Sequence, residues 1–323
     1  MKQIKWLSAC LLSAGLAIAA PAVLSQEFPS RPIRFIVPLP PGNPFETHFR
    51  LVANKMAERM GVTAVVENRP GGNGVPAVVA MMQAPADGYT VLDVFSQVTI
   101  TQYLMKDPPY DVRRDLVPLA QIGYTPLAVS VQSGINVKTW AELVAYAKAQ
   151  PKKLTYGGFG GGTSLVGAEL LILKGLNAVF VPYKDPTAPL LDLIGGRVDM
   201  VSGGPNDQLP YAKEGKLRPL IVLSTSRVPA MPNVPTAVEA TGDQELGFTT
   251  WLAGSVRAGT PKNIVDKLER EMVDAAKSAD IQAFSVKNAM VPEVQNAEGL
   301  RKIWEADLKR WEKVIRDAKI AVN

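Results

Sequence analysis

The sequence has one cysteine and one histidine in 323 residues, and both shortages exclude whole classes of site. One cysteine cannot form a disulfide within the chain, and one cysteine with one histidine cannot build a Cys/His metal cluster. Most catalytic triads are also excluded unless His48 serves as the base. Long runs of Lys or Arg are absent, so the net charge of +5 does not indicate a nucleic-acid-binding surface. We therefore expect no metal, no cofactor and no nucleic-acid partner.

The composition is that of a folded globular protein. Hydrophobic residues make up 47% of the chain and charged residues 20%, which is too apolar for a disordered chain and sufficient for a core. The even spread of 26 glycines and 26 prolines excludes a coiled coil. The length indicates one large domain or two of ordinary size.

The first 25 residues have the pattern of a secretory signal peptide. Lys2 and Lys5 precede an apolar run at 7–20, and small residues follow as far as Ser25. The run is shorter than a membrane span, which needs about 20 residues. We expect cleavage after Ser25 and, because no cysteine remains beyond that point, a location in a bacterial periplasm. The segment ending at Cys10 also resembles a lipoprotein acylation site, although most of the apolar run follows this cysteine instead of preceding it.

Beyond the signal, short β-branched runs alternate with helical patterns, which is typical of an α/β fold with a largely parallel sheet. Strands are expected at 33–37, 62–67, 89–95, 154–156, 178–181, 198–202 and 217–224, and helices at 45–60, 75–84, 140–149, 165–173 and 188–194. Strands at 119–124 and 127–131 lie on either side of Pro126 and predict a crossing between two lobes. The last helix carries an apolar stripe formed by Leu300, Trp304, Leu308, Trp311 and Ile315. We expect the C-terminal helices to return to the first lobe.

A glycine-rich run at 157–162 follows a predicted strand and precedes a predicted helix. Backbone N–H groups in this position can bind an anion, with Thr163 and Ser164 as hydroxyl donors. A Walker loop would need a lysine after Gly162, and a dinucleotide fingerprint would need glycine at position 163. The sequence therefore predicts a carboxylate ligand in preference to a pyrophosphate. A tight turn packed against the sheet is the structural alternative.

Other loops occupy the same place between a strand and a helix, and ligands of open α/β sheets bind beyond the carboxyl ends of the strands. The candidate ligand-binding residues of all these loops are Gly42, Asn43, Phe45, Glu46, Ser96, Gln97, Gly158, Phe159, Gly160, Gly161, Gly162, Thr163, Ser164, Tyr183, Lys184, Asn206 and Asp207. Two of them have plain alternatives, since Glu46 could stabilise the first turn of its helix and Lys184 could be solvated. His48 lies at the border of an apolar stripe, so we expect it to be partly buried and hydrogen-bonded instead of contacting a ligand.

These loops and their order resemble the substrate-binding proteins of tripartite tricarboxylate transporters, the Bug-type periplasmic receptors. The similarity extends over nearly all of the chain beyond the signal and rests on the segments 28–33, 66–71, 84–90, 155–157, 181–184, 193–199 and 259–261. It implies a two-lobed periplasmic-binding fold of type II, in which each lobe is a mixed, mostly parallel sheet flanked by helices. The ligand cleft then lies between lobe 1, formed by 26–123 with 253–323, and lobe 2, formed by 124–252.

The resemblance also implies a function: a receptor that closes on a carboxylated organic molecule and delivers it to the membrane permease subunits. We expect a monomer, because free diffusion between ligand and permease requires nothing more. One departure concerns the ligand. The first loop of the family usually reads Pro-Gly-Gly-x-x-Asp, whereas this chain has Asn43, Pro44, Phe45 and Glu46 in that region. Pro44 has no N–H to offer a carboxylate. We therefore expect a larger or more apolar acid, including aromatic ones, with Phe45 forming one wall, unless Phe45 anchors its helix to the core.

Two other functions compete with the transport receptor. A hydrolase could use Ser164 as nucleophile, but the second glycine of a Gly-x-Ser-x-Gly turn is missing, and His48 would be its only histidine base. A sensor that reports ligand occupancy to a membrane signalling partner would have the same fold. The sequence does not separate the sensor from the transport receptor.

Overall fold

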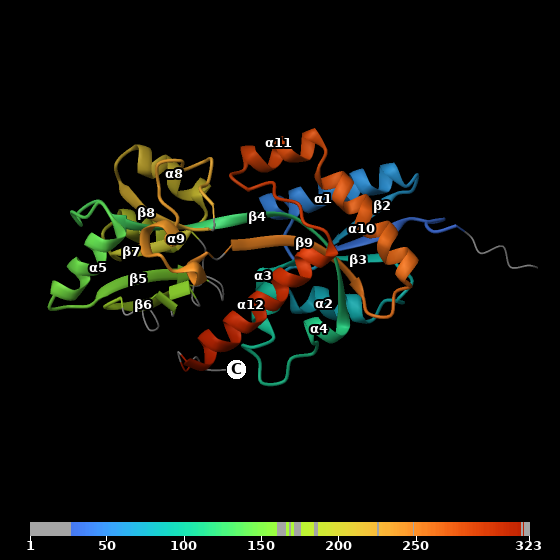
Figure 1. Ribbon diagram of the computed structural model, residues 1–323, viewed down its shortest axis with the longest axis horizontal. Helices are drawn as coiled ribbons and strands as arrows, with labels where there is room; N and C mark the ends of the chain where they lie inside the picture. Colours follow the sequence, from blue (N-terminus) through green and yellow to red (C-terminus); the bar gives the residue numbers. More distant parts are fainter. Residues whose placement is uncertain are drawn as a thin grey trace, which may run out of the picture.

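The computed structural model describes residues 27–159, 166–167, 169–170, 176–183, 187–224, 226–247, 249–317 and 319. Its helices and strands form two lobes side by side, joined by two long strands and by the C-terminal helix (Figure 1). Within the described residues, no helix is both long enough and apolar enough to span a membrane.

The sheet of lobe 1 has the strand order β2-β1-β3-β9-β4. Its strands are β1 (Ile33–Val37), β2 (Ala64–Asn68), β3 (Thr90–Phe95), β9 (Thr249–Arg257) and the first part of β4 (Leu116–Gln132). Strands β1, β2 and β3 are parallel to one another, and β9 is antiparallel to both β3 and β4. The mixed, mostly parallel sheet that the sequence predicts is therefore present.

The sheet of lobe 2 is built on the second part of β4, which pairs with β7 on one edge and β8 on the other. Its further strands are β5 (Leu154–Phe159), β6 (Ala178–Tyr183), β7 (Met200–Gly203) and β8 (Leu217–Leu223). The two strands predicted around Pro126 are in fact one continuous strand. Pro126 ends the pairing of β4 with β9, opposite Thr249, and pairing with β8 begins at Leu127. A proline without an N–H is tolerated there because the ladder changes partner at that point.

The pairing directions place the strand ends of the two lobes face to face. β4 is antiparallel to β9, which is antiparallel to β3, so β1, β2 and β3 run in the same direction as β4, toward lobe 2. In lobe 2, β7 is antiparallel to β4, and β5 and β6 are parallel to β7, so all three run toward lobe 1. The loops at the carboxyl ends of the parallel strands of both lobes therefore face the space between the lobes.

Helices cover both faces of the two sheets. In lobe 1 and the C-terminal region they are α1 (Pro44–Arg59), η1 (Gly72–Gly74), α2 (Val75–Met82), α3 (Ser96–Thr101), α4 (Val112–Asp115), α10 (Lys262–Ala276), α11 (Ala279–Lys287) and α12 (Ala297–Asp317). In lobe 2 they are α5 (Trp140–Ala149), α7 (Ala188–Ile194), α8 (Pro205–Lys213), α9 (Ala237–Thr241) and η3 (Gln244–Leu246). The lobe boundaries at 123/124 and 252/253 remain a prediction.

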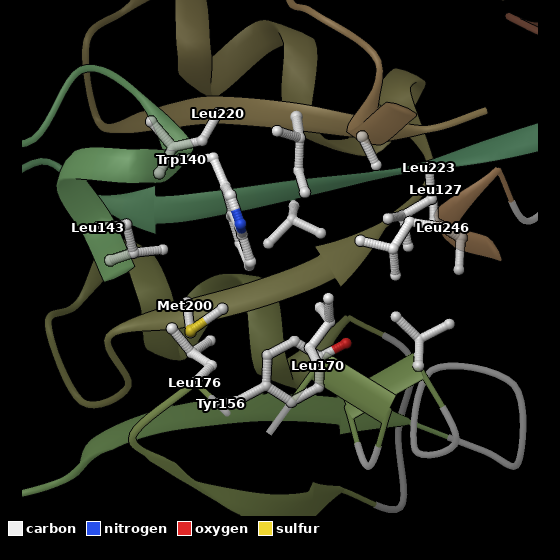
Figure 2. Close-up of a cluster of buried hydrophobic side chains, with 14 of the residues drawn as sticks. Leu127, Trp140, Leu143, Tyr156, Leu170, Leu176, Met200, Leu220, Leu223 and Leu246 are labelled. Carbon is white, nitrogen blue, oxygen red and sulfur yellow. The ribbon is translucent and has the colours of Figure 1, made fainter. Parts of the chain in front are cut away.

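Each lobe has its own buried core. One cluster of lobe 1 joins β1, α1 and α10, and another lies on the opposite face under α2 and α12. Figure 2 shows labelled members of the lobe 2 cluster, among them Trp140, Tyr156 and Leu246, gathered around its strands.

The apolar stripe predicted on the last helix is buried, but it serves both lobes. Leu300 and Trp304 belong to a lobe 1 cluster, whereas Trp311 and Ile315, two to three turns later, belong to the cluster of lobe 2. Helix α12 therefore spans the junction, and its second half contributes to a core that also includes residues of β4, β5, β7, β8 and α5 (Figure 1).

Replacing Trp311 by Ala should lower the free energy of unfolding by about 3–5 kcal/mol, because the side chain is fully buried and its removal leaves a large cavity. Glu312→Ala, at the next and exposed position, is the control and should stay within about 0.5 kcal/mol of the wild type. Urea unfolding followed by circular dichroism gives both values. A loss below about 1 kcal/mol for Trp311→Ala would show that α12 is not part of the lobe 2 core.

Candidate functional site

The first interlobe loop connects β1 to α1 and is held by its own side chains. The Asn43 side-chain oxygen caps α1 by accepting a hydrogen bond from the Phe45 backbone N–H at 2.9 Å. Gly42 has a φ of +85°, which favours glycine at this position. Phe45 is half-buried and packs against the lobe 1 core. This packing agrees with the alternative that Phe45 anchors its helix, and it leaves part of the ring exposed.

Glu46 is buried and turned toward the protein, where it forms a loop clamp with Asn68 and Arg50. The amide nitrogen of Asn68 donates to the Leu39 carbonyl at 2.9 Å and to Glu46 Oε1 at 3.2 Å. Arg50 Nε donates to Glu46 Oε1 at 2.8 Å, and the Gly42 N–H lies 3.4 Å from Oε2. These bonds tie the first loop to the end of β2, so Glu46 positions the loop instead of offering its carboxylate to the cleft.

The loop clamp also decides the charge of Glu46. Burial alone would raise the pKa of this carboxyl group, but hydrogen bonds from Arg50 and Asn68 outweigh burial and hold the pKa below its usual range. The clamp therefore contains a carboxylate at neutral pH.

The second loop follows β3, where the predicted residues begin the short helix α3. Ser96 is buried, and its carbonyl accepts a hydrogen bond from the Thr99 hydroxyl at 2.7 Å. The Gln97 amide nitrogen donates to Thr101 Oγ1 at 3.3 Å and is half-buried. Both residues lie at the carboxyl end of a parallel strand of lobe 1, as the sequence predicts.

The predicted residues of lobe 2 that the structure describes lie at three strand ends. Gly158 and Phe159 end β5, and Asn206 and Asp207 lie exposed in the first turn of α8, directly after β7. Tyr183 ends β6, but its hydroxyl donates to Asp192 Oδ2 at 2.7 Å, within the packing of lobe 2. The remaining predictions, Gly160, Gly161, Gly162, Thr163, Ser164 and Lys184, lie outside the described residues.

His48 is buried and partnered, as predicted. Its Nε2 lies 2.9 Å from Ser285 Oγ on α11, and its ring stacks on Phe284 with centroids 6.1 Å apart. Burial lowers the pKa of His48 to about 4, so the ring is neutral at pH 7. With no exposed surface, this imidazole cannot reach a substrate between the lobes.

Asp93, an acid in the middle of β3, is not among the residues predicted from the sequence. Its side chain is fully buried, and neither carboxylate oxygen has a hydrogen-bond partner among the described residues. Burial, with a smaller contribution from the Glu46 carboxylate, raises the pKa of Asp93 well above its usual range. The sequence does contain an indication of this buried acid, because Asp93 interrupts the otherwise apolar strand Val91–Phe95.

The Asp93 pKa predicts how stability depends on pH. The folded protein holds this proton more tightly than the unfolded chain, so the wild type loses stability as the pH rises above about 4, by up to about 1.4 kcal/mol per pH unit. Asp93→Asn removes this loss. We expect the variant to equal the wild type near pH 4 and to exceed it increasingly toward pH 7 in urea unfolding.

The exposed residue Asp107 supplies the control, since Asp107→Asn should follow the wild type across the same pH range. A free-energy difference between Asp93→Asn and the wild type that stays constant with pH would contradict the assignment of Asp93 as a protonated acid.

The arrangement suits binding of an organic anion between the lobes. The N-terminus of α1 and that of α8 lie at the facing strand ends, and helix N-termini favour negative charge. Among the described residues, no group of three or more His, Cys, Asp or Glu side chains could hold a metal ion.

Comparisons with known proteins agree with this geometry. The family model described as "Tripartite tricarboxylate transporter family receptor" matches residues 48–320. A Pseudomonas sp. strain P51 protein, encoded in the tcbD-tcbE intergenic region, is 30% identical over 97% of this chain and 95% of its own length. The protein BugT of Bordetella pertussis is 31% identical over 93% of both chains.

Solved structures share the fold along nearly their whole length. An R. palustris protein solved with adipate is 28% identical, with a TM-score of 0.75 over 91% of this chain and 99% of that one. The periplasmic binding protein BugD is 26% identical, with a TM-score of 0.71 over 91% and 99%. The chain therefore belongs to the tripartite tricarboxylate transporter receptor family, whose members are periplasmic solute-binding receptors.

Proposed function

We propose that this protein is an exported receptor that binds one carboxylated organic molecule between its lobes and passes it to the permease subunits of a tripartite transporter. The observation that carries the proposal is the strand direction: β1 and β3 of lobe 1 end opposite β5, β6 and β7 of lobe 2. Family membership supplies the transport role. The relative solved with adipate supports a carboxylate ligand, since the two chains are 28% identical along nearly their full length.

A ligand between the lobes contacts both of them, and this is what a receptor requires. Closure is driven by the ligand only if the closed arrangement binds it more tightly than the open one. Loops from one lobe alone would not distinguish the two arrangements. The facing loops of lobe 1 and lobe 2 supply the difference in ligand affinity between the open and closed arrangements. The permease would recognise the closed form.

The described residues favour binding over catalysis. His48 is the single histidine of the chain, and it is buried against Ser285 and Phe284. A Ser164 nucleophile would therefore lack a histidine base. We propose a monomer that binds its ligand without turnover.

A thermal-shift screen of residues 26–323 tests the function. The probes are C4 to C8 dicarboxylates, acidic amino acids and aromatic mono- and dicarboxylates. An acid present at a hundred times its dissociation constant should add about 2.7 kcal/mol and raise the melting temperature by a few degrees. The exposed part of Phe45 leads us to expect the largest shifts from six-carbon or aromatic acids.

Each pattern of hits has a definite meaning. Hits confined to C4 acids or amino acids would keep the receptor and contradict the Phe45 wall. Hydrolysis or other conversion of a bound acid would contradict the receptor without catalysis. The absence of any shift across all the acids would contradict a carboxylate ligand.

The loop clamp predicts a specific loss of affinity. Asn68→Ala removes the hydrogen bonds to the Leu39 carbonyl and to Glu46, so the first loop loses its link to β2. We expect the affinity for the best acid of the screen to fall about tenfold, with a stability loss of about 1–2 kcal/mol. Isothermal titration calorimetry measures the affinity.

Asn288→Ala is the matched control for the loop clamp. The Asn288 amide donates to the Phe284 carbonyl at 2.8 Å at the end of α11, so the variant loses a comparable bond away from the interlobe loops. Equal affinity losses in the two variants would contradict the positioning role of Asn68.

A further inference from the structure

A cavity lies at the junction of the lobes, where α12 crosses β4 and β9. Its volume is about 530 Å³, within the range of small-molecule pockets. Gln121 and Tyr124 of β4, Trp251 of β9 and Glu169 of lobe 2 are among its lining residues, together with one side of α12. Among the residues that the structure describes, the lining includes none of the predicted ligand-binding residues of the interlobe loops. We call it the hinge cavity.

One end of the hinge cavity is acidic and aromatic. Trp251 is buried, stacks on Trp304 with ring centroids 6.0 Å apart, and donates its indole N–H to Asp307 Oδ2 at 2.5 Å. Burial raises the pKa of Asp307 to about 6, although the Trp251 bond and the Arg310 charge act against it. A carboxylate has acceptor sites beyond the one that Trp251 uses. This end of the cavity therefore suits an ammonium group lying against an aromatic wall.

The other end of the hinge cavity is basic. Arg310 and Lys313 follow Asp307 by three and six residues along α12, which corresponds to about 4.5 and 9 Å along the helix axis. Arg310 forms a 2.6 Å ion pair with Glu169, which is almost fully buried. Lys309, on the exposed face of α12, also lines the cavity. Glu169 balances the charge of Arg310, and Glu293 also lines the cavity, so the positive charge that suits a carboxylate comes from Lys309 and Lys313.

We propose that the hinge cavity binds a second small molecule, a zwitterion whose ammonium group lies at Asp307 and Trp251 and whose carboxylate lies toward Arg310 and Lys313. The length of the charged stretch of α12 fits a chain of about four to six carbons between the two groups. Because β4, β9, α12 and Glu169 all line the cavity, a bound molecule contacts both lobes, and its affinity depends on their relative angle. The cavity shares no described lining residue with the interlobe loops, so this proposal does not depend on the identity of the first ligand.

Calorimetric titration of residues 26–323 with 5-aminopentanoate tests the proposal, with pentanoate as the comparison. We expect the wild type to bind the zwitterion at least tenfold more tightly than the plain acid. Asp307→Asn should weaken binding of the zwitterion about 10- to 100-fold, the range for a lost hydrogen bond to a charged group. The asparagine oxygen can still accept the Trp251 bond, so the fold is retained.

Two further variants complete the test. Lys313→Gln, at the exposed basic end, should weaken the zwitterion several-fold, and it remains informative if Asp307→Asn unfolds. Glu312→Gln, at an exposed position of α12 that is not among the lining residues, is the control and should bind like the wild type. Absence of zwitterion binding by the wild type would overturn the proposal. Binding unchanged in both Asp307→Asn and Lys313→Gln would overturn it as well, because the zwitterion would then occupy another site.

Discussion

The antiparallel pairing of β4 with β9 determines the directions of the other strands and how the two lobes face each other. The ladder runs from Leu116–Arg257 to Pro126–Thr249, and β4 then continues without a break as a strand of the second sheet. One strand shared by two sheets fixes the direction of every strand that pairs with it. The shared strand β4 is therefore also the reason why the strand ends of the two lobes face each other. The lobes are connected by β4, β9 and α12, so any change in the angle between them has to be accommodated along these three segments.

Buried acidic side chains inside lobe 1 differ in how many hydrogen bonds they accept. Glu46 is buried but held by Arg50, Asn68 and the loop backbone, and its carboxylate gives the first loop a fixed shape. Asp93 is buried without a partner among the described residues, and burial raises its pKa well above the usual range. The contrast follows from position: Glu46 lies at a helix start, where donors converge, whereas Asp93 lies in mid-strand, where the backbone donors already serve the sheet.

Much of the fold could be predicted from the sequence because it depends on local signals. The periodicity of the strand at 33–37 and of the last helix needs no knowledge of the rest of the chain, and the structure confirms both. The division of α12 between two cores could not be predicted, since a single apolar stripe does not say what covers each turn. Likewise, Pro126 indicated an interruption, but the continuity of β4 depends on partners that are distant in sequence.

The site was predictable in its positions and less so in its roles. Strand-to-helix loops could be located from glycines and prolines, and Asn43, Ser96 and Asn206 do lie at such places. Whether a side chain faces the cleft or the protein depends on neighbours in space. Glu46 turns inward because it accepts hydrogen bonds from Asn68 and Arg50. Tyr183 turns inward because its hydroxyl donates to Asp192. The spacing of these residues along the chain does not predict those contacts.

The path of α12 has a consequence for how the molecule can be divided. Lobe 1 takes β9 and α10 from beyond lobe 2 in the sequence, and lobe 2 takes Trp311 and Ile315 from a helix whose first half packs on lobe 1. Neither lobe therefore corresponds to a continuous stretch of chain. A cut between β8 and β9 would leave lobe 2 without the α12 residues of its core and lobe 1 without β9. The two halves of this receptor therefore cannot be exchanged with those of a relative as independent modules.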